Sequence, residues 1–376
     1  MRRLNMHLLS KIAGVLGVFA LVTGVAASSM TRAANSASDG GSCSNVPKPY
    51  ATTEQFRDRF EKCVGGKTVA WVPLGMGTPL MAEWTYWIRN YANAYGMKFK
   101  MRDPNWDPTK QVAVVQAFIN EKPDVLIVHN LDTGLVANLL KQANEKGIFV
   151  LQVNMESNYK SDAFVGGDAI GIGRLIAQDM VAQCGAGTAP SHEIALVAGD
   201  PNSGWTQQAW EGAGPVFKQH PEIKIVAHQF ADWQRSKAYD ISSTILKQHP
   251  NLCAIWSDWD QMAYGAARAV KAAGLESKVK VFTADSSTIT CQGIGEGVFY
   301  QSYGYNVPEQ GRQLMTLAAY LLQSGKPPGS SRTVIYAPVV KINRSNWNLP
   351  GMCYDGTGRV ITVQYNDKGE VVRAPR

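Results

Sequence analysis

The chain has 376 residues, of which 45% are hydrophobic and 18% are charged, an ordinary globular composition on a chain too long for one ordinary core. Its formal net charge is +7, but four of the positive charges (Arg2, Arg3, Lys11 and Arg32) lie within residues 1–34. Because the remainder has no Lys/Arg cluster interleaved with aromatic residues, we expect no nucleic-acid partner.

Residues 1–34 predict a secretory signal peptide. Arginines precede an apolar run, Ile12–Val25, and small residues follow it up to an expected cleavage point near Ala33–Ala34. A membrane anchor is the alternative, but the run is shorter than the ~20 residues that a spanning helix needs. We therefore expect a soluble mature protein that is exported to the periplasm and begins with a lead-in segment over 35–66.

The cysteine pattern indicates disulfides rather than a metal site. All six cysteines follow the predicted signal peptide, at Cys43, Cys63, Cys184, Cys253, Cys291 and Cys353. An even number in an oxidising compartment allows up to three disulfides. Cys43–Cys63 is the simplest pair, whereas Cys253 could instead be a buried thiol in an apolar strand. No CxxC pair and no cluster at zinc spacing occurs, so we expect no metal and no cofactor.

Strand-like and helical patterns alternate from residue 67 onward. Apolar strand-like runs occupy 68–74, 124–130, 149–154, 193–199, 224–230, 253–258 and 280–285. Stretches with apolar residues at helical spacing begin near Leu80, Thr109, Gly134, Gly171, Trp205, Gln234, Asp260 and Pro308. Continuous apolar runs indicate strands that are covered on both faces. We therefore predict an α/β fold with doubly wound, parallel sheets.

The pattern falls into two similar halves, which we predict to be two lobes. A glycine-rich break, with Gly166–Gly167 and Gly171–Gly173, separates them and is interpreted as flexible. The last helix and the segment after it are expected to return between the halves. The predicted lobes are 67–166 with 306–336, and 167–305 with 337–376; the crossings are expected near Gly167–Asp168, Tyr303–Asn306 and Tyr336–Val339.

Few motifs point to catalysis. GDAIGIGRLI (167–176) superficially resembles a dinucleotide-binding loop, but Ile176 stands in place of the third glycine. Nucleophile-elbow, P-loop and HExxH motifs are absent, and the histidines are scattered. Only His129 lies at the C-terminal end of a predicted strand, where ligands bind in such sheets.

Tryptophans near strand ends are more informative. Four lie at or just beyond predicted strand ends in the second half: Trp205, Trp233, Trp256 and Trp259. Each could fill the core, but several at one sheet edge suit stacking on a sugar ring or another flat solute.

Within AIWSDWDQ (254–261), we assign Trp256 to packing and expect Trp259 to face a cleft. Asp258 and Gln261 indicate a capping-box-like helix start.

Several stretches in order carry a family resemblance. They are TPLM (78–81), AVVQAFINEKPDVLIVHNLDTG (113–134), GIFVLQVNME (147–156), the glycine-rich break, the stretch from FADWQRSK to AVKAAG (230–274), KVFTADSS (280–287) and NVPEQGRQ (306–313). On these, residues 67–340 resemble the ribose-binding-protein-like periplasmic solute-binding proteins (type I) of bacterial ABC importers. The resemblance implies two Rossmann-like lobes, joined by a three-crossing hinge, that close on one solute.

The resemblance also implies which residues contact the ligand. In the first lobe the family's contact positions fall at Leu80, Met81, His129, Asn154 and Met155. In the second lobe they fall at Ala209, Trp233, Trp259 and Asp285, with Tyr305 or Asn306 near a hinge.

This chain departs from the family's sugar-binding pattern at several of those positions. Leu80 and Met81 replace a pair of aromatics, and Asn154–Met155 replaces an Asp-Arg pair. Ala209 replaces an arginine, and Trp205, four residues earlier on the same helical face, could cover the vacated space. We therefore expect a sugar-like, polyol or less polar cyclic ligand.

The expected function is that of an extracytoplasmic, monomeric receptor without enzymatic activity. It would capture a small molecule between its lobes and deliver it to the membrane subunits of an ABC permease. A sensory co-receptor for a chemoreceptor or sensor kinase is the alternative with the same fold. A transcriptional repressor is disfavoured because the export signal occupies the place of a DNA-binding helix-turn-helix, and an enzyme because no nucleophile–base constellation occurs.

Overall fold

The computed structural model describes residues 43–185, 187, 189, 191–358, 364–365 and 371–372. The predicted signal peptide, residues 1–34, lies outside the described residues. None of the helices in the described part of the chain combines the length and hydropathy of a membrane-spanning segment.

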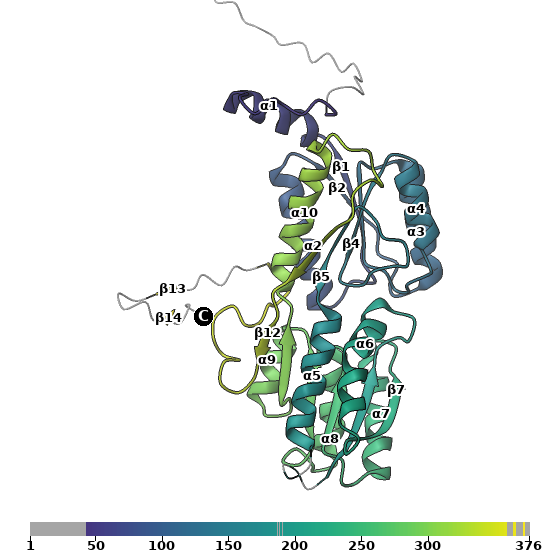
Figure 1. Cartoon of the computed structure of the whole chain (residues 1–376), viewed down its shortest axis with the longest axis vertical. Helices are drawn as coiled ribbons and strands as arrows, with labels where there is room; N and C mark the ends of the chain where they lie inside the picture. The colour runs from purple at the N-terminus through teal and green to yellow at the C-terminus, as the bar shows by residue number, and fades with distance from the viewer. Residues whose placement is uncertain are drawn as a thin grey trace, which may run out of the picture. The chain divides into compact units, whose positions relative to one another are not determined.

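The first lobe is built on a parallel sheet with strand order β11-β5-β4-β3-β1-β2. Its strands are β1 (Thr68–Val72), β2 (Lys98–Met101), β3 (Val125–Val128), β4 (Phe149–Val153), β5 (Ala163–Gly167) and β11 (Thr333–Ala337). Helices α2 (Pro79–Ala94) and α10 (Val307–Gln323) cover one face, α1 (Thr53–Val64) packs on α10, and α3 (Pro108–Glu121) and α4 (Ala137–Glu145) cover the other face (Figure 1). Apolar side chains fill both interfaces.

The second lobe is built on a sheet with strand order β12-β10-β9-β8-β6-β7, in which only β12 is antiparallel to its neighbour. Its strands are β6 (Glu193–Ala198), β7 (Lys224–Phe230), β8 (Ala254–Ser257), β9 (Lys280–Ala284), β10 (Gln301–Gly304) and β12 (Val340–Ile342). Helix α5 (Ala169–Cys184) lies on β8 and β9 beside α6 (Gly204–Gln219), while α7 (Arg235–Gln248), α8 (Asp260–Ala272) and α9 (Thr288–Gly295) form a second group. A short antiparallel pair, β13 (Gln364–Tyr365) and β14 (Val371–Val372), follows.

The chain passes between the two sheets at three places, from β5 to α5, from β10 to α10 and from β11 to β12. The sequence predicts crossings at these places. Gly167 and Ala337 pair with each other at the end of the first sheet, directly before two of these crossings. The three crossings run between two separately hydrogen-bonded sheets, which is the construction of a hinge.

Each apolar run that predicts a strand contains one in the structure, but β2, β5, β10, β11 and β12 are missed, as is the pair β13 and β14. Strand β2 is a short edge strand whose side chains alternate between exposed and half-buried. Strand β5 ends in two glycines, and β10 has the polar sequence QSYG. These three strands lack the apolar run because pairing with neighbouring strands, rather than their own side chains, places them in the sheet.

The glycines that predict a flexible break lie within a strand and a helix, where they allow close packing. Gly166–Gly167 lie inside β5, and Gly171–Gly173 lie inside α5. A Cβ on Gly173 would lie 2.0 Å from the Ala209 carbonyl oxygen on α6. A Cβ on Gly212 would likewise lie 1.9 Å from the Ile170 oxygen on α5. The two helices therefore approach at backbone distance because neither carries a side chain at these points.

Three disulfides join the six cysteines. They are Cys43–Cys63, Cys184–Cys253 and Cys291–Cys353. The predicted Cys43–Cys63 pair is confirmed. The alternative that Cys253 is a buried thiol is wrong, since its sulfur bonds that of Cys184 at the end of α5.

A pair of glycine substitutions on α6 tests the close packing of α5 on α6. Gly212→Ala should lower the free energy of unfolding by roughly 1–3 kcal/mol because the new methyl group overlaps the Ile170 backbone. Gly214→Ala is the matched control, since its Cβ would meet its nearest neighbour, Trp210, at an ordinary 3.6 Å. That variant should be neutral or gain roughly 0.5–1 kcal/mol. Urea unfolding of both variants measures the difference, and equal effects would contradict the packing.

Candidate functional site

A narrow cavity of about 20 Å³ lies between the two lobes. Most of its wall residues come from loops that follow strands of both sheets, the usual place for a ligand in an open α/β sheet. The wall consists of Leu74, Leu80, Met81, Trp106, His129, Asn154, Met155, Trp205, Trp233, Asp258, Trp259 and Tyr305. We call this space the interlobe cavity.

Helix caps set the first-lobe part of the wall. Thr78 caps α2 by accepting a hydrogen bond from the Met81 amide, and Pro79 occupies the first turn. Leu80 and Met81, in that same turn, are thereby directed into the cavity, and both are buried.

Trp106 and Trp233 occupy matching places in the two lobes. Trp106 follows the edge strand β2, and Trp233 follows the edge strand β7. Both residues have left-handed backbone, with φ of 61°, and so do the residues before them, Asn105 and Asp232. Left-handed backbone at a non-glycine residue costs on the order of 1–3 kcal/mol and is typical of functional sites.

A glycine lies beneath each of these two rings. A Cβ on Gly75, which follows β1, would lie 2.3 Å from the Trp106 ring. A Cβ on Gly199, which follows β6, would lie 2.3 Å from the Trp233 ring. In each lobe, one indole ring therefore packs against a glycine in the loop after the first strand of that lobe's sheet.

Trp259 lies between these two rings. Its centroid is 6.0 Å from that of Trp106 and 6.4 Å from that of Trp233. Its indole N–H donates a 2.9 Å hydrogen bond to Asp285 Oδ2, which fixes the ring plane. Trp256 is buried among core residues, as the sequence predicts.

His129 and Trp233 bring polar atoms to the wall that no described residue satisfies. Neither ring nitrogen of His129 has a hydrogen-bond partner in the described part of the chain, although the side chain is 1% exposed. Burial lowers the pKa of His129 to about 3, so the ring is neutral and offers one donor and one acceptor. The Trp233 indole N–H is likewise buried and unpartnered among the described residues. Buried polar groups normally have partners, so these atoms suit hydrogen bonds to a ligand.

Asp258 does not cap α8, which corrects the capping-box interpretation. The N-cap is Trp259, and no side chain caps this helix. Asp258 Oδ2 instead accepts hydrogen bonds from the Gly199 amide at 2.9 Å and from Thr206 Oγ1 at 3.1 Å. Burial raises the pKa of Asp258 to about 6. The carboxyl group thus ties the loop after β8 to the loop after β6 and to the first turn of α6 at the cavity wall.

Eight of the predicted site residues lie in the wall, and two do not. Asp285 is fully buried behind Trp259 rather than beside the cavity. Asn306 is exposed and lines a different cavity, on the other side of the β10–α10 crossing. Its neighbour Tyr305 faces the interlobe cavity instead, with its ring centroid 5.0 Å from that of Trp205. Ala209 is buried beneath α5 and is absent from the wall.

Leu74, Trp106 and Asp258 belong to the wall but escaped the sequence prediction. Trp106 could have been found from DPNWDP (103–108), which matches ADWQR (231–235) in placing a tryptophan between an edge strand and a helix.

Comparison with known proteins identifies the family. The profile described as periplasmic binding protein domain matches residues 69–327. The chain belongs to this family. Family members are binding proteins of transporters, so this protein is a solute receptor and not an enzyme.

Relatives and solved structures agree with this assignment. The ribose import binding protein RbsB of Bacillus subtilis is 23% identical over 66% of this chain and 78% of its own length. The D-allose-binding periplasmic protein of Escherichia coli is 30% identical over 49% of this chain and 61% of its own length. A Mycobacterium smegmatis protein solved with β-D-fucofuranose has a TM-score of 0.68 at 23% identity, covering 75% of this chain and 93% of its own. A galactofuranose-binding protein has a TM-score of 0.67 at 20% identity, and the match covers 75% of this chain and 96% of that protein's chain.

The raised pKa of Asp258 predicts a pH-dependent stability. Because the native state holds this proton up to about pH 6 and an unfolded Asp only to about pH 4, stability should fall as pH rises between these values. Asp258→Asn keeps an acceptor for Gly199 but cannot ionise. In this variant the loss of stability with rising pH should be smaller by on the order of 1–3 kcal/mol. The pH dependence that remains should come from Asp260, because burial raises the pKa of Asp260 to about 6 as well. Urea unfolding at several pH values measures this, and an unchanged slope would contradict it.

Proposed function

We propose that this receptor is exported and binds a small cyclic solute of sugar size that carries few hydroxyl groups, such as a deoxy sugar. The solute would occupy the interlobe cavity and pass to an ABC permease. Residues 1–34 would act as the signal peptide that directs export, and the binding residues would be those of the cavity wall.

The apolar character of the wall supports this ligand class. Four tryptophans, two methionines and two leucines make up most of it, and no Lys or Arg is among the described wall residues. Flat indole faces suit the C–H face of a sugar ring. The cavity measures about 20 Å³ in this structure, which is room for little more than one water molecule. A solute of sugar size would therefore enter only when the lobes move apart about the three crossings.

The unpartnered polar atoms supply few hydrogen bonds to the ligand. His129 offers one donor and one acceptor, and Trp233 offers one donor. The Asp258 carboxyl already accepts two hydrogen bonds from its own lobe. A ligand rich in hydroxyl groups would bury several of them against Leu80, Met81 or Met155, which costs free energy when they are unpaired. A less hydroxylated ring avoids that cost.

Ligand binding would close the lobes because both lobes contribute residues to the cavity wall. We infer that the lobes, 67–166 with 306–336 and 167–305 with 337–376, move as rigid bodies about the three crossings. His129 and Trp106 lie on the first lobe, while Trp233 and Trp259 lie on the second. A solute that contacts both sets binds the closed form better than the open form and shifts the population toward it.

D-fucose and D-galactose form a matched pair of ligands for testing this class, because D-fucose lacks only the 6-hydroxyl of D-galactose. We expect D-fucose to bind more tightly, by up to about 100-fold, which is the discrimination an apolar wall achieves against one added hydroxyl. Thermal shift followed by titration calorimetry, with D-ribose and D-allose as further ligands, measures the preference. Equal or tighter binding of D-galactose would refute the deoxy-sugar class.

A further inference from the structure

The C-terminal segment beyond β12 reaches back to the binding site. It lies past residue 327, where the family match ends. The Cys291–Cys353 disulfide attaches the segment to α9. The Tyr354 amide donates to the Ser286 carbonyl at 3.0 Å, and the Tyr354 carbonyl accepts from the Thr288 amide at 2.9 Å. Residues 353 and 354 are thus fixed to the second lobe.

Four residues later the same segment contacts the first lobe. The Gly358 amide donates to Glu83 Oε2 on α2 at 3.2 Å, and Glu83 is 1% exposed. A Cβ on Gly358 would lie 1.8 Å from the Tyr86 ring, and one on Gly356 would lie 3.0 Å from Pro79 Cα. The chain therefore lies directly on α2, the helix whose first turn carries Leu80 and Met81. We call residues 353–358 the strap.

Tyr354 connects the strap to Trp259 through Asp285. The Tyr354 hydroxyl donates to Asp285 Oδ1 at 2.7 Å, and the Trp259 indole donates to Asp285 Oδ2 at 2.9 Å. All three side chains are buried. One carboxyl group therefore holds both the ring that faces the interlobe cavity and the ring that anchors the strap.

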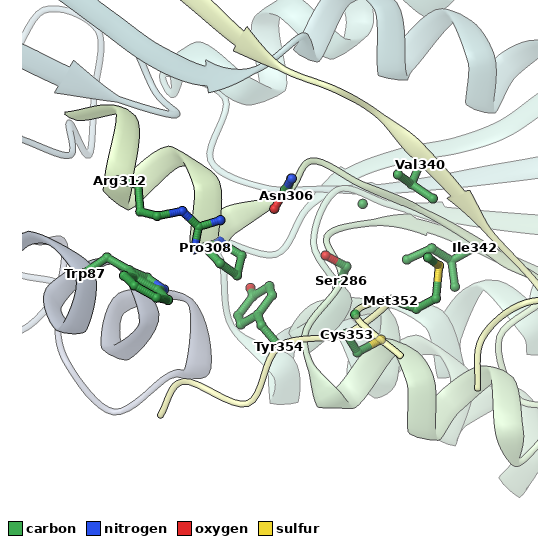
Figure 2. Close-up of a pocket in the computed structure, with 12 residues that line it drawn as sticks. Trp87, Ser286, Asn306, Pro308, Arg312, Val340, Ile342, Met352, Cys353 and Tyr354 are labelled. Atoms are coloured by element: carbon green, nitrogen blue, oxygen red, sulfur yellow. The ribbon is translucent and has the colours of Figure 1, made fainter. Parts of the chain in front are cut away.

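A second cavity, of about 220 Å³, adjoins the strap on the far side of the β10–α10 crossing. Figure 2 shows its wall, in which Tyr354 lies between Trp87 of α2 and Cys353, with Arg312, Pro308 and Asn306 on the α10 side. Tyr305 faces the interlobe cavity while Asn306 faces this one. Tyr354 thus lines the same cavity as Asn306 of the β10–α10 crossing and, through Asp285, is connected to Trp259.

We propose that Tyr354 is a positioning residue for Trp259 and that the strap couples the orientation of this ring to the first lobe across the hinge. The proposal rests on the proposed function only through the place of Trp259 in the solute site. Removing the Tyr354 hydroxyl should leave Asp285 Oδ1 with the Ser286 amide as its donor. It should thereby loosen the Trp259 ring without altering the core around Trp256.

Tyr354→Phe tests this without any ligand, and Tyr320→Phe, at an exposed position on α10, is the matched control. The readout is tryptophan emission, with Trp259→Phe defining the contribution of Trp259. Acrylamide should quench that contribution more strongly in Tyr354→Phe than in the wild type or the control. Unchanged quenching would overturn the proposal.

The pH profile of the same emission separates positioning from packing. Burial and the nearby Asp260 raise the pKa of Asp285 well above its ordinary value, and the hydrogen bond from Tyr354 lowers it. The titratable groups facing Asp285 are Asp260, Tyr305 and Tyr354. Tyr354→Phe keeps the ring but loses the donor, so the emission midpoint should move to higher pH. A midpoint equal to that of the wild type would overturn the role of the hydroxyl.

A second variant tests the strap if Tyr354→Phe folds poorly. Cys291→Ser with Cys353→Ser releases the attachment to α9, and Cys184→Ser with Cys253→Ser removes a disulfide at the end of α5 as the control. The Cys291→Ser, Cys353→Ser variant should show stronger quenching of Trp259 by acrylamide. D-fucose should also dissociate about fivefold faster from this variant, as expected if the hydrogen bond from Tyr354 to Asp285 is lost. Equal effects of the two pairs on quenching would overturn the strap.

Discussion

Two tryptophans seated on glycines shape the binding site. Trp106 and Trp233 adopt left-handed backbone, and each ring lies where Gly75 or Gly199 has no side chain. Trp259 lies between them and contacts both. The rest of the wall has to accommodate three indoles, which leaves a small, apolar cavity with few polar atoms. The strained backbone persists because the parallel sheets of both lobes fix the loops on each side of it.

Buried polar groups then decide what the cavity can bind. Asp258 and Asp285 are occupied by partners from their own lobe and the strap, and burial raises the pKa of each. Neutral His129 and the Trp233 indole keep free hydrogen-bonding atoms in the described structure. The acids thus hold the wall together, whereas His129 and Trp233 would bind the solute in the proposed function. This division is what the proposed ligand, with few hydroxyl groups, would require of a sugar-receptor fold.

The sequence predicts the fold because continuous apolar runs and helical spacing report directly on a covered parallel sheet. It also predicts His129 and Trp259, since both follow apolar strands that periodicity reveals. Trp106 escapes because β2, the strand before it, has the alternating exposure of a short edge strand and no apolar run. The role of Asp285 escapes for another reason. Its partner Tyr354 lies 69 residues further along the chain, and no local pattern connects the two.

The central claim is that a solute binds against Trp259 between the lobes. Calorimetry on Trp259→Ala and Trp256→Ala, with the solute giving the largest thermal shift, tests it most directly. Trp259→Ala should weaken binding by roughly 1–3 kcal/mol, because a stacking ring is lost, and should lower the melting temperature less than Trp256→Ala does. Normal binding by Trp259→Ala together with early melting would show that the ring belongs to the core and would contradict the account.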